Sequence, residues 1–157
     1  MFFAEHGGST YEGAWRHGKA SGPGTWTKEG VGQYEGEFKG DEMHGEGTFL
    51  WKSGATFKGN WEFGKKSGHG LMIFRDGSKY EGSWLKDNRH GEGSMTWQSE
   101  ASYEGQFVDD LFEGKGTYTW PTGEYYEGRW ARGMRNGKGK WFYDDGRTRY
   151  EGNWVND

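Results

Sequence analysis

Residues 126–139 read YEGRWARGMRNGKG, and this stretch recurs along the chain in variant form. The leading aromatic residue of each copy falls at residue 11, 34, 57, 80, 103, 126 or 150, so the step is 23 residues five times and 24 once. A fixed period of this length indicates a repeat array, in which each unit is too small to bury its own apolar face and must stack on its neighbours. We therefore expect a single array over residues 1–157, with about six complete units and a half unit at each end.

Each position of the repeat, counted from the leading aromatic residue, has its own chemistry. Position 3 is Gly and position 5 is Trp or Phe in all seven units, and positions 12 and 14 are both Gly in the six complete ones. Position 16 is large, and position 18 is aromatic in five of six units, the exception being Lys28. Because side chains alternate between the faces of a strand, positions 1, 3 and 5 share one face of a first strand, and positions 12, 14, 16 and 18 share one face of a second.

Turn residues separate these strands. Gly, Asp and Asn gather at positions 7–11, as in Lys86-Asp87-Asn88, and predict a hairpin turn. A second turn follows, as at Asp76-Gly77. The chain is thus predicted to be all-β, an elongated single-layer antiparallel meander of stacked β-hairpins. Residues 98–101 lack the turn glycine and residues 29–32 displace it, so we expect these two turns to be looser.

The repeated glycines on the predicted aromatic face require a structural explanation, since glycine weakens a strand. A four-residue hairpin loop would place Trp15 opposite Gly24, where the indole can lie over bare backbone. The glycine at position 3 would then face the large residue at position 16. We expect a continuous row of aromatic rings in contact with one another, packed on a sheet with little side-chain bulk.

The pattern Y-E-G-x-W/F-x-x-G-x-x-x-G-x-G, repeated about every 23 residues, resembles the MORN (membrane occupation and recognition nexus) repeat. The resemblance covers nearly the whole chain; Phe57-Lys58 is a local departure. It implies a rod or groove that serves partner proteins, including cytoskeletal and ciliary ones. It also implies membranes as an alternative, because MORN repeats occur in junctophilins and plant phosphoinositide kinases.

The amino-acid composition limits the kind of core, the chemistry and the cellular location that the protein can have. The chain has 31 Gly, ten Trp, nine Tyr, ten Phe and no Cys, so the core must be aromatic and thiol chemistry is excluded. It has no run of about 18 apolar residues for a transmembrane helix, and residues 1–5 are too short to form a signal peptide. We expect a cytoplasmic protein, with association to the cytoskeleton implied by the resemblance.

No arrangement of residues predicts an enzyme. His44 and His90 share position 11 but lie two units, or about 19 Å, apart, too far for one metal ion. The Gly-x-Gly pairs lack the third glycine and the helix of a phosphate-binding loop. The chain carries a net charge of −4, and its aromatic residues serve the repeat, which argues against nucleic acid. We predict no catalytic residue, cofactor or metal.

The aromatic face is the first candidate site. Tyr and Trp offer a large contact area with few rotatable bonds, which suits a partner helix or an extended peptide. The alternative is that the rings are simply core. The predicted partner-binding residues are Tyr11, Trp15, Tyr34, Phe38, Trp61, Tyr80, Trp84, Tyr103, Phe107, Tyr126 and Trp130.

A basic block within residues 126–149 is the second candidate. It gives a possible anion patch of Arg129, Arg132, Arg135, Lys138 and Lys140. An anionic membrane attracts clusters of about 4–8 basic residues, so phosphoinositide or membrane binding is the alternative function. A third reading is that the array is the targeting part of a larger enzyme.

The two ends of the array carry no evident polar cap. An open edge strand can pair with another chain. Either the chain is a piece of a longer array, or its end strands pair with a partner, which would give a homo-oligomer.

Overall fold

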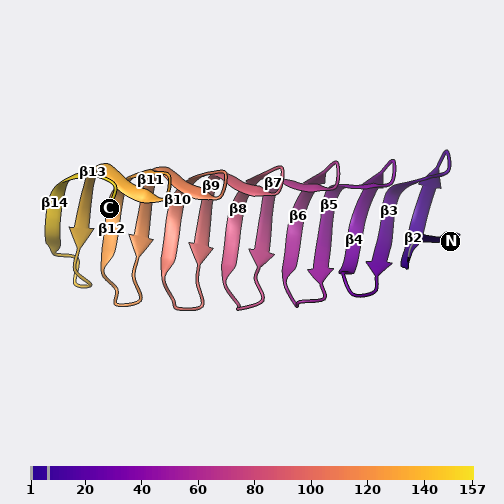
Figure 1. Ribbon diagram of the computed structural model, residues 1–157, viewed down its shortest axis with the longest axis horizontal. Coiled ribbons are helices and arrows are strands. Elements are labelled where there is room, and N and C mark those ends of the chain that lie inside the picture. The colour runs from indigo at the N-terminus through magenta and orange to yellow at the C-terminus, as the bar shows by residue number, and fades with distance from the viewer. Residues whose placement is uncertain (1, 7) are drawn as a thin grey trace. The chain divides into compact units, whose positions relative to one another are not determined.

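The computed structural model describes residues 2–6 and 8–157, and side chains from residue 8 onward. The chain divides into two compact units, Met1–Arg75 and Asp76–Asp157. All the regular structure in these residues is β-strand, with no helix (Figure 1). Within each unit the strands follow one another in chain order and pair antiparallel, so the predicted all-β meander of hairpins is confirmed.

The strands of the first unit are β1 Phe2–His6, β2 Ser9–Arg16, β3 Lys19–Lys28, β4 Gly32–Lys39, β5 Glu42–Trp51, β6 Thr56–Glu62 and β7 Lys65–Ile73. The strands of the second unit are β8 Lys79–Leu85, β9 Asn88–Thr96, β10 Ser102–Val108, β11 Leu111–Thr119, β12 Tyr125–Ala131, β13 Met134–Phe142 and β14 Thr148–Trp154. The first and last strands match the predicted half units.

Two-residue turns join the strands of each hairpin at positions 7 and 8. Both turn residues have positive φ, for example 52° at His17 and 76° at Gly18, or 50° at Lys86 and 77° at Asp87. Such turns match the right-handed twist of the flanking strands. The tip also contacts the preceding hairpin, since the amide of Asp110 donates to the Arg89 carbonyl at 3.1 Å.

The same backbone hydrogen bond recurs in the turns that follow Trp51, Trp97, Trp120 and Tyr143. The Gly123 amide donates to the Trp120 carbonyl at 2.9 Å. Where the sequence lacks the glycine, Glu100 takes its place with a φ of 70°, and its amide donates to Trp97 at the same 2.9 Å. The expectation of a looser turn over residues 98–101 was therefore wrong, because a non-glycine residue adopts the left-handed conformation there.

The register within a hairpin differs from the predicted one. Gly13 pairs with Gly24, and Trp15 pairs with Ala20, so one residue of β2 faces three of β3. This bulge includes Gly22, whose φ of 87° suits glycine. The predicted pairing of Trp15 with Gly24 was wrong, because the loop has two residues rather than four and the bulge then places Gly24 opposite Gly13.

Tyrosine, rather than tryptophan, lies over the glycines of its own hairpin. The ring of Tyr34 fills the space in which a Cβ on Gly36 or Gly47 would stand, and its hydroxyl donates to the Glu37 carbonyl at 3.0 Å. Gly36 and Gly47 face each other across the ladder, so position 3 faces another glycine and not position 16 as expected. The same arrangement recurs at Tyr11, Tyr80, Tyr103 and Tyr126.

Within each unit, the tryptophan or phenylalanine at position 5 lies beside the glycine at position 12 of the preceding hairpin. Trp130 pairs with Gly114, and its indole Nε1 donates to the Gly116 carbonyl at 3.0 Å. Rings at position 1 then have edge-to-face neighbours within their own hairpin and in the next hairpin of the same unit. Tyr103 meets Phe107 at 5.1 Å and Trp130 at 5.5 Å, both at 86°. This geometry favours aromatic pairs and builds the core of each unit.

A Cβ added beneath a buried tyrosine should weaken the fold strongly. Gly47→Ala would push its methyl group into the ring of Tyr34, which is fully buried and cannot move aside. We expect a loss of about 3 kcal/mol in the free energy of unfolding, measured by urea titration. Gly54→Ala is the control: its site is open and only its φ of 90° is unfavourable, so about 1 kcal/mol is expected. Equal losses for the two variants would contradict the role of the ring.

The buried tyrosines should make the protein sensitive to alkali. Burial raises the pKa of Tyr80 to about 12 and also raises the pKa values of Tyr34 and Tyr103 above the ordinary 10. As the pH rises, the unfolded chain therefore releases these protons before the folded protein does. The contribution of the buried hydroxyl groups to stability is fully present below pH 10 and is lost as the pH rises through 12. The melting temperature should fall steeply over this interval, and less steeply in Tyr80→Phe. A flat profile would contradict the burial of these hydroxyl groups.

Candidate functional site

The aromatic face of each unit is the first candidate surface. Ten of the eleven predicted binding residues are buried, from Tyr34 at 0% exposed to Trp130 at 7%, and Trp15 is half-buried. These rings contact one another edge to face, as Tyr126 contacts Trp130 at 5.2 Å. They therefore form the core of the sheet and leave little of their own area for a partner.

Rings at positions 16 and 18 are more accessible on the same face. In the second unit we call Trp97, Tyr118, Trp120 and Trp141 the ring row; all four are half-buried. Trp97 lies 5.6 Å from Tyr118, Tyr118 lies 4.9 Å from Trp120, and Trp120 stacks on Trp141 at 5.1 Å and 19°. The prediction named the buried rings and missed these, although their alternation in the sequence gave the signal.

The residue at position 10 fills the space between the core rings. Phe112 stacks on Tyr103 with centroids 3.7 Å apart. Arg89 lies over Phe107 at 5.3 Å, and its Nε donates to Asp110 at 2.8 Å. A cation over an aromatic ring is favourable, and the carboxylate fixes the guanidinium in place. In these two hairpins the residue at position 10 therefore packs against the core rings.

Arg135 repeats this arrangement in the sixth hairpin. Its guanidinium lies 4.3 Å from the ring of Trp154, and its Nη2 donates to Asp157 at 2.8 Å. Arg135 lowers the pKa of Tyr126, although burial is the larger effect and raises it overall. Of the predicted anion patch, Arg135 thus lies on the aromatic face, and Arg132 lies in the hairpin tip.

The face opposite the aromatic rings in the second unit carries a groove of about 1080 Å³. Its floor is bare backbone at the paired glycines Gly105, Gly116, Gly128, Gly139 and Gly152. Arg129, Lys138 and Lys140 of the predicted patch line it and are exposed. Lys115 and the groove glutamates were not predicted, although alternation along the strands places them on this face.

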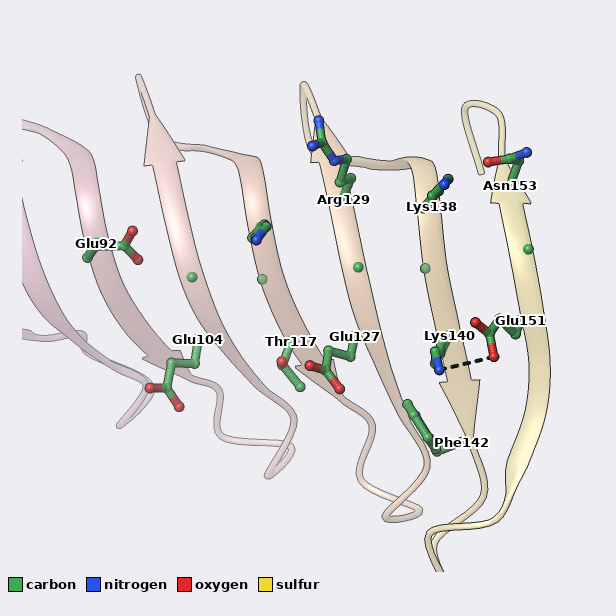
Figure 2. A pocket seen from close by; sticks show the side chains of 16 residues that line it. Glu92, Glu104, Thr117, Glu127, Arg129, Lys138, Lys140, Phe142, Glu151 and Asn153 are labelled. Atoms are coloured by element: carbon green, nitrogen blue, oxygen red, sulfur yellow. Dashed lines mark ion pairs between the residues drawn. The ribbon is translucent and has the colours of Figure 1, made fainter.

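The two banks of the groove differ in charge. Figure 2 shows Arg129 and Lys138 on one side of the strand centres, and Glu104, Glu127 and Glu151 on the other. Lys140 lies on the acidic side and pairs with Glu151 at 3.0 Å. The lining as a whole therefore has balanced charge, with three of its four cations on one bank and three of its four glutamates on the other.

Across residues 2–6 and 8–157 no three His, Asp or Glu side chains gather as metal ligands. His90 lies near Asp109, with Nδ1 and Oδ1 3.7 Å apart, at a hairpin tip. No helix in this part of the chain is long and apolar enough to cross a membrane. What both faces offer is an extended surface for contact.

Comparison with known proteins gives two findings. No curated protein matches the sequence significantly. The fold is similar to the TCP domain of SAS-4 (dCPAP) from Drosophila melanogaster, solved in complex with a proline-rich motif of Ana2 (dSTIL). The TM-score is 0.50 at 11% identity, and the alignment covers 80% of this chain and 69% of that one. At this identity the similarity concerns the fold alone.

The sequence itself matches the family description "MORN repeat" over seven segments that coincide with the hairpins described above. The matched residues are 11–29, 34–56, 57–79, 80–101, 103–125, 126–146 and 150–157. The first six segments begin at the aromatic residue that covers a glycine pair, which is Phe57 in the third, and the seventh begins at Tyr150, which lies over Gly152. This protein belongs to the MORN repeat family.

Proposed function

We propose that the protein is a non-enzymatic scaffold that binds an extended peptide segment of a partner protein along the aromatic face. The observation that carries the proposal is the ring row, which exposes part of four adjacent rings above a buried aromatic core. Rings held in place by such a core lose little freedom on binding, which favours affinity.

An extended, proline-rich segment suits this surface better than a helix. Aromatic-lined surfaces bind proline-rich segments because such segments are already extended and lose little entropy. The TCP domain, which shares the fold, was solved with a proline-rich motif. This similarity supports a peptide ligand without identifying it. The cytoskeletal or ciliary partner and the cytoplasmic location stay predictions from the family resemblance, and the end-strand homo-oligomer stays a prediction from the open edges.

Membrane binding is less favoured than peptide binding. The five predicted cations do not form one surface, because Arg135 is engaged on the aromatic face and Lys140 is paired with Glu151. The glutamates of the groove would also repel an anionic bilayer that approached this face.

Removing two rings of the ring row should weaken peptide binding without unfolding the protein. We expect some peptides of a proline-rich synthetic set to bind, and Trp97→Ala with Trp120→Ala to weaken binding about tenfold or more by calorimetry. The fold should tolerate the change, since position 18 is already Lys28 in the first hairpin; thermal melting checks this.

The matched control is Phe142→Ala, which removes a half-buried ring from the opposite face, where it stacks on Tyr125 at 4.5 Å. Position 17 holds Thr27 and Thr96 elsewhere, so this variant should also fold and should bind normally. The absence of any binding peptide, or equal losses in the control and the double variant, would refute the proposal.

A further inference from the structure

The groove of the second unit has a charge arrangement that the repeat itself does not require. The glycines of its floor are fixed by the rings on the other face, but positions 4 and 13, which form one bank, are free to vary. In the second unit Lys115, Arg129 and Lys138 occupy these positions on the neighbouring strands β11, β12 and β13. We call these three residues the basic bank.

The first unit has no such bank. Its residues at positions 4 and 13 are Ala14, Pro23, Glu37, Glu46, Asn60 and His69. The cations are therefore a local feature of the sixth hairpin and its neighbour strand β11, where Lys115 lies directly opposite Arg129. All three are exposed, and none of them forms an ion pair among residues 8–157. Like charges on adjacent strands repel one another and would be relieved by an acidic ligand.

Glutamates face the basic bank across the glycine floor. Repeat position 2 is a glutamate on strands β10, β12 and β14, namely Glu104, Glu127 and Glu151. We call these three residues the acidic bank. A fourth glutamate, Glu92 on β9, stands at position 13 beyond the cations. A ligand that fills the groove therefore meets Lys115, Arg129 and Lys138 on one side and Glu104, Glu127 and Glu151 on the other. Lys140, on the acidic side, is already paired with Glu151 at 3.0 Å.

We propose that this groove binds an extended segment of a partner protein in which acidic and basic residues alternate. In an extended chain successive side chains point to opposite sides, and residues two apart are about 6.8 Å from each other. Such a chain, lying along the glycine floor across the strands, directs its acidic residues to the basic bank and its basic residues to the acidic bank. The basic bank spans three strands, or about 10 Å, which accommodates two acidic residues of the ligand.

The alternation distinguishes this ligand from a polyanion. A nucleic acid or an anionic membrane would satisfy Lys115, Arg129 and Lys138 but would meet Glu104, Glu127 and Glu151 at the same time. A segment with its charges in two blocks would match one bank and be repelled by the other. The site lies on the face opposite the ring row, so this proposal does not depend on the peptide binding proposed above.

The test uses fluorescence anisotropy with a labelled synthetic peptide that alternates Lys and Glu. We expect binding at low salt that Arg129→Glu weakens about fivefold or more and Arg129→Lys preserves. Glutamate is native at this position as Glu37, so the fold should persist, and the Tyr126 hydroxyl bonds only the backbone carbonyl of residue 129. The matched control is Arg132→Asp at the exposed tip, with the same change in charge and the native precedent of Asp109; it should leave binding within about twofold.

Two further probes separate sequence pattern from bulk charge. A peptide of the same composition with its Lys and Glu in two blocks, and phosphatidylserine vesicles, should both bind more weakly than the alternating peptide. The proposal is overturned if the block peptide or the vesicles bind as well, if Arg132→Asp has the same effect as Arg129→Glu, or if the alternating peptide does not bind. The variant lacking Trp97 and Trp120 should bind it normally, which keeps the two proposed surfaces distinct.

Discussion

The contact between a tyrosine ring and two facing glycines determines the rest of this structure. Tyr103 lies over Gly105 and Gly116, which pair across the strands, and its hydroxyl donates to the Gln106 carbonyl at 3.0 Å. Only glycine leaves room for the ring, so the ring lies directly against the backbone of the two strands. A single layer of aromatic rings therefore forms the core. The ring in turn sets the position of its edge-to-face neighbours, which link each hairpin to the next within a unit.

This contact also separates the two faces of the sheet in their chemistry. On the aromatic side nearly every position is constrained, including position 10, where Arg89 and Phe112 pack among the core rings. On the other side, positions 2, 4, 13 and 15 need only be compatible with a strand. Differences in function between repeats are therefore expected mainly on the polar face and among the outer rings, where a substitution does not disturb the packing.

The sequence predicted much of the fold because its key signals are local. The alternation of Tyr126, Gly128 and Trp130 and the turn residues act within a few residues of the chain, and the 23-residue period repeats these signals. The register was mispredicted because the bulge depends on a positive φ at residues such as Gly22. The sequence does not show which glycines adopt a positive φ, because other glycines in the repeat are there to leave room for a ring. The turn at Glu100 could not be foreseen either, since the left-handed conformation of a glutamate is fixed by its surroundings.

The candidate site was less predictable. The sequence identified which face carries aromatic rings, but burial of Tyr34 or Phe107 results from edge-to-face packing between hairpins, which no single repeat shows. The anion patch was predicted from proximity in the sequence alone. Arg135 and Lys138 are an odd number of residues apart, and strand alternation already places them on opposite faces, so that signal was present.

The strict chain order of the strands has a mechanical consequence. Within each unit a strand is bonded only to the strands before and after it in sequence. A force that pulls a terminal strand away from its neighbour acts on the hydrogen bonds between the two strands one after another. These bonds therefore break one at a time. Each hairpin released would add 23 residues of slack chain before the next resists. A unit of this kind yields in small, even steps under tension and can close again from the hairpins that remain folded.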